Sequence, residues 1–193
     1  VGHAIVIIYI TPNAISAGLD LVTAAGVLST LAGVSVLTRF ITPVMADFVG
    51  SKWCMAIMFI LQGLPVLLLF FTHEVWHFYV WAVIFGIGYG GEGSAFPIIN
   101  RQYFGRGPMG RSFGWQQFGA GSGMAFGGWI GGVLFDMSGS WAPVIILSTV
   151  ASITGALILM SMAPTNKTLI GDWEESLPPE ARTPTTPLLA PAD

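Results

Sequence analysis

Long apolar stretches that are almost free of charge alternate with short polar connections along this chain. A helix needs about 20 mainly apolar residues to cross about 30 Å of hydrocarbon, because lipid offers backbone amides no hydrogen-bonding partner. Each stretch meets that length, so the pattern predicts five full membrane-spanning helices. Residues 21–38, 53–72, 112–135 and 137–166 contain no Asp, Glu, Lys or Arg, and residues 78–100 contain only Glu92.

Basic residues fall in every second connection between these stretches. If each stretch crosses once, one membrane face carries Lys52, Arg101, Arg106, Arg111 and Lys167. The connections on the other face, residues 73–77 and 137–140, contain no Lys or Arg. Because Lys and Arg are enriched on the cytoplasmic side of membrane proteins, we expect the basic connections to be cytoplasmic. The predicted location is the plasma (cell inner) membrane, with a multi-pass topology.

Composition supports a lipid environment and separates a tail from the spans. Charged residues make up 9% of the chain, against roughly 25% in soluble domains. The apolar residues 1–10 indicate the outer part of an earlier, truncated helix, so the chain is interpreted as a piece of a larger protein. Residues 164–193, rich in Pro, Thr and Glu, cannot bury enough apolar area to order themselves. They are predicted to be a disordered cytoplasmic tail that follows a bundle formed by residues 1–163.

A short internal repeat indicates how the spans are related. The pattern Asp-x-x-Gly-Ser occurs at residues 47–51 and again at residues 136–140. An odd number of predicted spans separates the two copies, which places them on opposite membrane faces. Inverted three-helix repeats are typical of secondary transporters, whose paired units rock around a site near the bilayer midplane. The repeat therefore favours a transporter.

These segments resemble the major facilitator superfamily and, within it, the monocarboxylate-transporter-like branch. Residues 39–52, Arg-Phe-Ile-Thr-Pro-Val-Met-Ala-Asp-Phe-Val-Gly-Ser-Lys, are similar to the loop motif of the superfamily. The glycine-rich residues 86–92, the following Tyr103-Phe-Gly105 and residues 127–140 are similar to the branch. The resemblance covers residues 1–163. It implies an all-α membrane fold in which these are helices seven to twelve of a twelve-helix bundle, with the amino-terminal six helices absent.

In the family motif, Gly, Asp and basic residues clamp neighbouring helix ends and take part in gating. By this resemblance the gating residues are Asp47, Gly50, Lys52, Asp136 and Gly139. The sequence departs from the motif at two positions, because Pro43 stands where Gly is usual and Phe48 where a basic residue is common. These departures imply a weaker clamp than in typical members.

Glu92 lies near the centre of an apolar stretch. A carboxylate at a helix centre costs about 2.5 to 3.5 kcal/mol on insertion scales unless it is protonated, paired or facing water. One interpretation is a group that couples protons or orients the substrate. The other is a structural hydrogen bond to a neighbouring helix. Gly90, Gly91 and Gly93 surround Glu92 and would let another backbone approach it closely.

Arg39 lies late in its span, with Ser35 one turn earlier on the same helix face. By resemblance it matches the arginine that binds the substrate carboxylate in monocarboxylate transporters, and a guanidinium fork suits that task because it holds both oxygens. Animal members carry Asp at the position of Ser35. Because of this departure, the resemblance does not support an Asp–Arg proton relay here. Glu92 or Asp20 is then the candidate for proton coupling. The alternative is an arginine that extends to lipid phosphates near a helix end.

Four further polar residues complete the candidate set for substrate binding or coupling. Asp20 precedes a span, where the helix dipole favours an acid, and capping is the preferred interpretation. Gln116 and Gln117 begin another span and would bond a solute or, as the preferred interpretation, a neighbouring helix. Tyr9 would face the pathway from the partial helix, together with His3, although the two do not share a helix face cleanly.

Two glycine patterns are interpreted as packing features. Residues 119, 123, 127 and 131 are glycines that repeat every four positions, a smooth stripe that predicts close helix approach. Residues 86–91 match the GxGxxG dinucleotide fingerprint, which needs a preceding strand. Here the match lies inside an apolar helix. We expect no cofactor, no metal site, no nucleic-acid partner and no enzymatic activity.

The expected function is secondary active transport of a small organic anion by alternating access. Monocarboxylates or short dicarboxylates are the favoured cargo, moved by proton symport or by anion exchange. The implied partners are the lipid bilayer, the anion, protons and the missing amino-terminal half. The cargo rests on the resemblance and on Arg39. The alternative is a non-transporting membrane scaffold or receptor that keeps the same fold.

Overall fold

The structure is a computed structural model that describes residues 2–72, 74–104 and 109–162. These residues form helices and contain no strand. In chain order the elements are α1 (Gly2–Ser16), α2 (Leu21–Val49), α3 (Ser51–Gly63), the 3-10 helix η1 (Leu64–Phe71), α4 (Val75–Phe104), α5 (Met109–Ser138) and α6 (Ala142–Ser161).

The five full spans predicted from the apolar pattern are confirmed. α2, α4, α5, α6 and the continuous unit of α3 with η1 are long and apolar enough to cross a membrane. α3 changes to 3-10 turns at Leu64, next to Pro65, because proline has no N–H to donate to the α-helical ladder. α1 is shorter, at 15 residues, and continues through Pro12 to Ser16. The predicted tail at residues 164–193 lies outside the described residues.

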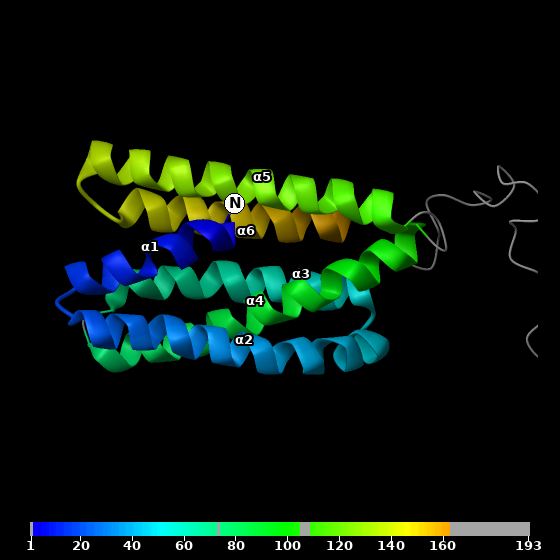
Figure 1. The fold of residues 1–193 in the computed structure, drawn as a ribbon, viewed down its shortest axis with the longest axis horizontal. Helices are drawn as coiled ribbons and strands as arrows, with labels where there is room; N and C mark the ends of the chain where they lie inside the picture. Colours follow the sequence, from blue (N-terminus) through cyan, green and yellow to red (C-terminus); the bar gives the residue numbers. More distant parts are fainter. Residues whose placement is uncertain (1, 73, 105–108, 163–193) are drawn as a thin grey trace, which may run out of the picture.

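The helices run antiparallel in sequence order (Figure 1). The α2–α3 turn, the ends of α4 and α5 that follow one another in the chain, and the end of α6 lie at one end of the molecule. The α1–α2, η1–α4 and α5–α6 connections lie at the other end. Lys52, Arg101 and Arg111 therefore share one end, as the alternating pattern predicted, whereas Arg106 and Lys167 lie outside the described residues. Assigning that end to the cytoplasm stays a prediction.

The two copies of the internal repeat each place a glycine of positive φ just after a helix end, at opposite ends of the bundle. Gly50, between α2 and α3, has φ +87° and donates its N–H to the carbonyl of Ala46 at 2.9 Å. Gly139, between α5 and α6, has φ +63° and donates its N–H to the carbonyl of Phe135 at 2.8 Å. Positive φ is accessible to glycine at little cost, which explains the glycine in both copies.

α4 packs against both α2 and α3, and in Figure 1 it runs from the lower edge of the bundle, beside α2, to the end that precedes α5. Near its start it contributes the largest fully buried side chains, Phe78, Trp81 and Phe85. α5 lies on the outside, above α6 in Figure 1, and leaves Trp115 and Trp129 exposed. Exposed apolar side chains of this size suit contact with lipid or with another membrane-embedded element.

We predict that cysteines placed at the two ends of the bundle react from opposite sides of the membrane. Trp76 and Arg111 are exposed at opposite ends, whereas the native Cys54 is buried and contributes little background. In a full-length protein without other reactive cysteines, an impermeant thiol reagent should label Trp76→Cys from one side and Arg111→Cys only from the other. Labelling of both variants from the same side would contradict the topology.

Candidate functional site

Glycines on α4 bring three helices close together. A methyl group at Gly86 would lie 2.9 Å from the Leu31 carbonyl oxygen of α2, and one at Gly90 would collide with the backbone of Ser35. On the α3 side, a methyl group at Gly88 would lie 2.8 Å from the Met58 carbonyl oxygen. The glycine-rich segment therefore provides two packing notches, one for α2 and one for α3, and the dinucleotide-binding interpretation is rightly set aside.

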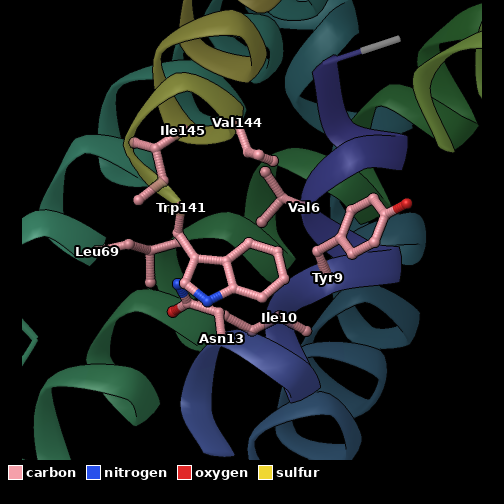
Figure 2. Close-up of a pocket in the computed structure, with 8 residues that line it drawn as sticks. All are labelled: Val6, Tyr9, Ile10, Asn13, Leu69, Trp141, Val144 and Ile145. Atoms are coloured by element: carbon pink, nitrogen blue, oxygen red, sulfur yellow. The ribbon is translucent and has the colours of Figure 1, made fainter. Parts of the chain in front are cut away.

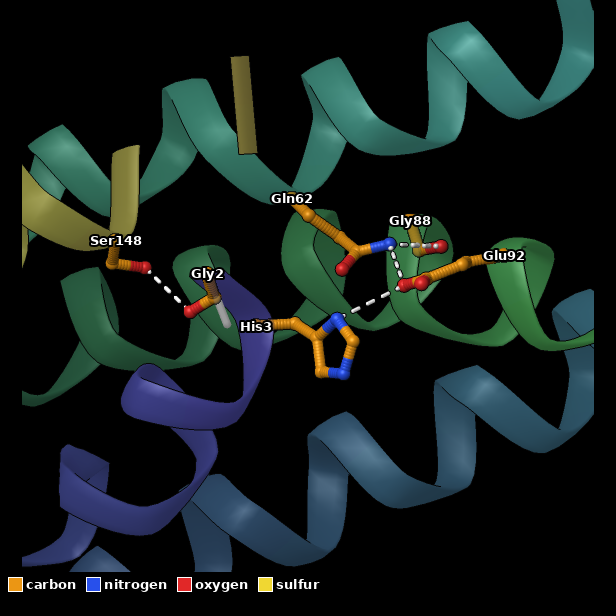
Figure 3. A network of polar contacts seen from close by, with 6 residues as sticks. All are labelled: Gly2, His3, Gln62, Gly88, Glu92 and Ser148. Atoms are coloured by element: carbon orange, nitrogen blue, oxygen red, sulfur yellow. Dashed lines mark hydrogen bonds and ion pairs between the residues drawn. The ribbon is translucent and has the colours of Figure 1, made fainter. Parts of the chain in front are cut away.

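Glu92 follows these glycines and is buried, with 5% of its surface exposed. Its Oε2 accepts a hydrogen bond from Gln62 Nε2 of α3 at 2.7 Å and lies 3.1 Å from His3 Nδ1 of α1 (Figure 3). Gln62 Nε2 also donates to the Gly88 carbonyl oxygen at 3.0 Å. One carboxylate oxygen thus joins α1, α3 and α4.

His3 and Gln62 are the partners of Glu92 that the sequence did not reveal. The sequence pattern predicts only that His3 faces the pathway, and its ring also lies against Tyr89, with centroids 5.6 Å apart. Gln62 is a carboxamide inside an otherwise apolar stretch, which is the signal that could have identified it. Its Oε1 is buried and has no hydrogen-bond partner in the described parts of the chain, so the side chain is held by its amide nitrogen alone.

Arg39 of α2 lies beside Gly93, the residue that follows Glu92 on α4, and lines a cavity that Glu92 also lines. A methyl group at Gly93 would lie 3.7 Å from Arg39 Nε, and Ser94 Oγ donates to the Arg39 carbonyl oxygen at 2.9 Å. The cavity, of about 260 Å³, is lined by Arg39, Glu92, His3 and Gln117, among others. Among the described residues no carboxylate lies within ion-pair distance of the Arg39 guanidinium.

A second cavity, of about 440 Å³, meets the first at His3, Glu92, Phe96 and Ala120. Its walls include Gly119 and Gly123 of α5 and, from α6, Ala151, Ser152, Thr154 and Gly155. The buried polar cluster therefore stands between two hollows that α5 partly closes. A guanidinium, an imidazole and a carboxylate around such a space are suited to holding a small charged solute and a proton.

Comparison with protein families identifies the chain. The family model described as Major Facilitator Superfamily matches residues 2–190. The chain belongs to this superfamily. Membership agrees with the all-helical fold and with the resemblance drawn from the loop motif, and it indicates secondary transmembrane transport without enzymatic activity. A search of curated proteins finds no match to this chain.

Of the predicted gating residues, Gly50 and Gly139 lie between helices, whereas Asp47, Lys52 and Asp136 lie near helix ends. Lys52 is nearly buried and donates from Nζ to the Met162 carbonyl oxygen at 2.5 Å, so it ties the start of α3 to the end of α6. Asp47 and Asp136 are exposed, one on the last turn of α2 and the other on the last turns of α5. Neither carboxylate makes an ion pair within the described residues.

Two predicted site residues of α2 serve local structure. Ser35 is buried, its hydroxyl donates to the Ala32 carbonyl oxygen at 2.8 Å, and its backbone meets Gly90. Asp20 caps α2, since its carboxylate accepts from Thr23 N at 3.1 Å and from Thr23 Oγ1 at 2.6 Å. The hydrogen bond from the Thr23 side chain is the main cause that lowers the pKa of Asp20. Capping, the preferred interpretation for Asp20, is confirmed.

Gln116 and Gln117 are adjacent in sequence but lie in different surroundings. Gln116 Oε1 accepts from Asn100 Nδ2 of α4 at 3.1 Å, and Asn100 Oδ1 accepts from Ser112 Oγ at 2.9 Å. This confirms the helix-to-helix bond preferred for Gln116. Gln117, in contrast, lines the cavity that contains Arg39, so it is placed where it would contact a solute.

Tyr9 lies outside the cavities that contain Glu92. Its hydroxyl donates to the Gly128 carbonyl oxygen of α5 at 2.6 Å and points away from a small hollow beneath Trp141 (Figure 2). That hollow, of about 20 Å³ and almost entirely apolar in its walls, has room for about one water molecule. Tyr9 therefore fastens α1 to α5 in this structure.

The glycine stripe of α5 packs over only part of its length. Gly131 meets the ring of Tyr9, with a contact of 2.6 Å to a methyl group placed there. Gly119 has no atom within 4 Å of such a methyl group, and Gly123 lines the larger cavity. The prediction of a continuous packing stripe was wrong for this end of the helix, because the described helices leave a hollow there.

We expect Gly90→Ala to weaken the bundle, because its methyl group would meet the backbone of Ser35 rather than a side chain that can turn away. Overpacking of this kind costs about 1–3 kcal/mol. Thermal unfolding of the full-length protein in detergent would report the loss. Gly33→Ala is the matched control, since it adds a methyl group on α2 with no atom within 4 Å. Equal stability of the two variants would contradict the close α2–α4 contact.

Proposed function

We propose that this major facilitator chain contributes the anion-binding wall of a secondary transporter for small organic anions. The observation that carries the proposal is Arg39, whose guanidinium lines a cavity and has no carboxylate partner among the described residues. An arginine at such a place presents a planar fork that binds both oxygens of a carboxylate and stays charged at any physiological pH.

The distribution of charge around the cavity supports an anionic cargo. Glu92, the other charged group of this cavity, already has His3 and Gln62 against its Oε2. The negative charge of Glu92 is therefore partly compensated by hydrogen-bond donors within the protein, whereas the positive charge of Arg39 has no carboxylate partner among the described residues. The carboxylate of a bound solute would neutralise the charge of Arg39. The neutral Gln117 on α5 offers a further hydrogen-bonding group.

The size of the cavity supports a small cargo. At about 260 Å³ it lies just below the range of roughly 300–1,000 Å³ typical of pockets for drug-sized ligands. A monocarboxylate or short dicarboxylate fits such a space. We propose the monocarboxylate-transporter-like branch on this ground together with the resemblance in residues 39–52 and 86–92.

The proposal of alternating access is supported by the inverted turns and by superfamily membership. The Gly50 and Gly139 turns have the same hydrogen bond at opposite ends of the bundle, as expected for repeats that rock about a central site. The exposed apolar side chains of α2 and α5 would pack against a second six-helix unit. The solute would then be held between the two units, and moved by proton symport or anion exchange.

Replacing Arg39 with lysine tests the proposal, because lysine keeps the charge but loses the two-pronged contact. Charge-assisted hydrogen bonds contribute about 1.5–3 kcal/mol, so uptake at limiting solute should fall roughly tenfold to 150-fold. The measurement is uptake of labelled lactate, pyruvate and oxalate into vesicles bearing the full-length protein, with and without a pH gradient.

Arg111→Lys is the matched control, since Arg111 is exposed at the end of the bundle and lines no described cavity. It should transport as the unmodified protein does. Normal uptake by Arg39→Lys would remove Arg39 from the site. If the unmodified protein takes up none of these anions under any gradient, the non-transporting scaffold or receptor becomes the better interpretation.

A further inference from the structure

The hydrogen bonds around Glu92 determine which atoms are donors. The Gly88 carbonyl oxygen only accepts, so the Gln62 atom facing it at 3.0 Å is the amide nitrogen. The second hydrogen of that nitrogen is directed to Glu92 Oε2 at 2.7 Å. Oε2 is therefore an acceptor, and the same oxygen lies 3.1 Å from His3 Nδ1.

Between the two partners of this 3.1 Å contact, the proton belongs on the imidazole. An imidazole is ordinarily a stronger base than a carboxylate, and a carboxylate that accepts two N–H bonds is favoured in its ionised form. His3 then carries its hydrogen on Nδ1, and its other ring nitrogen, Nε2, is left with a lone pair. Nε2 points away from Glu92 (Figure 3), and His3 lines both cavities.

We propose that His3 Nε2 takes up and releases the proton that is coupled to anion movement, while Glu92 stays ionised and holds Nδ1–H. The inference deepens the proposed transport function and rests on it. On uptake an N–H bond forms at Nε2 and an O–H bond of a hydronium ion in the cavity breaks, so the His3–Glu92 pair changes from one negative charge to none. Release into water on the other side reverses both steps.

The groups that face the pair explain why proton and anion would move together. From α2, Arg39 shares the smaller cavity with His3, so its permanent charge disfavours an imidazolium nearby. A carboxylate bound to Arg39 would cancel that charge and favour protonation. By linkage, protonation of His3 would tighten anion binding by the same factor.

Among the described residues, the remaining elements around the pair contribute no further histidine, carboxylate or amine to the cavity walls. α3 supplies Gln62 and α5 supplies Gln117, both uncharged. α4 adds the phenol of Tyr89, and α6 adds the hydroxyls of Ser152 and Thr154. Histidine alone among the side chains in these walls ordinarily changes charge between about pH 5 and 8.

His3→Gln separates proton coupling from anion binding, because glutamine retains an N–H for Glu92 but does not titrate. In vesicles with the full-length protein, a pH difference of one unit should drive up to about tenfold accumulation of labelled lactate by 1:1 symport. His3→Gln should abolish this accumulation and retain lactate counterflow at equal pH. His77→Gln, which replaces a histidine stacked on Trp76 outside the cavities, should behave as the unmodified protein.

Two outcomes of this assay would overturn the proposal. Accumulation that survives in His3→Gln would show that another group carries the proton. Loss of counterflow at saturating lactate would show that His3 serves the anion step itself. Failure of the transport function is distinguishable, because it would appear as absent counterflow in the unmodified protein.

Nitrogen-15 NMR of histidine-labelled full-length protein tests the proton site without any solute. The His3 signals, assigned by their loss in His3→Gln, should show Nδ1 protonated throughout and Nε2 gaining its proton as the pH falls. Glu92→Gln should remove the preference for Nδ1–H. Titration at Nδ1, or none at either nitrogen, would refute the assignment even if the protein exchanges lactate.

Discussion

The carboxylate of Glu92 is the group around which the middle of this bundle is organised. A charge inside hydrocarbon costs about 2.5–3.5 kcal/mol on insertion scales unless partners replace its hydration. Here the partners come from two other helices, His3 on α1 and Gln62 on α3, and both meet the same oxygen. The short helix α1 is thereby anchored by a polar contact. This contact matters because, in lipid, the hydrophobic effect does not favour association of helices.

Glycine makes this contact geometrically possible. Gln62 reaches Glu92 because α3 lies against Gly88 with no side chain between the two helices. On the opposite side of α4, Gly90 admits the backbone of α2, and Gly93 lies beside the Arg39 side chain. The same run of small residues thus brings a carboxylate and a guanidinium to one cavity and keeps them on separate helices.

The parts of this structure that sequence predicted are those governed by local rules. Span lengths follow from hydrocarbon thickness, the Asp20 cap from the donors at a helix start, and the Gly50 and Gly139 turns from their shared pattern. Contacts between distant helices were not predictable in this way. His3 and Gln62 meet Glu92 only after three helices have packed, and the α5 glycines were misjudged because a smooth stripe does not reveal whether a neighbour fills it.

The glycine stripe of α5 contacts other helices over only part of its length, and this affects how the helix could move. At Gly131 the helix is held by the ring of Tyr9, and the Tyr9 hydroxyl bonds the Gly128 carbonyl oxygen. Toward Gly119 and Gly121 no described atom would touch an added methyl group, and these residues line the two cavities beside Glu92. α5 is therefore held at one end by Tyr9 and at the other by the hydrogen bond between Gln116 and Asn100 of α4, and between these points it is unpacked within the described residues. The middle of such a wall can shift beside the cavities with little packing to break, while the contacts of α1, α3 and α4 at Glu92 keep the polar cluster in place.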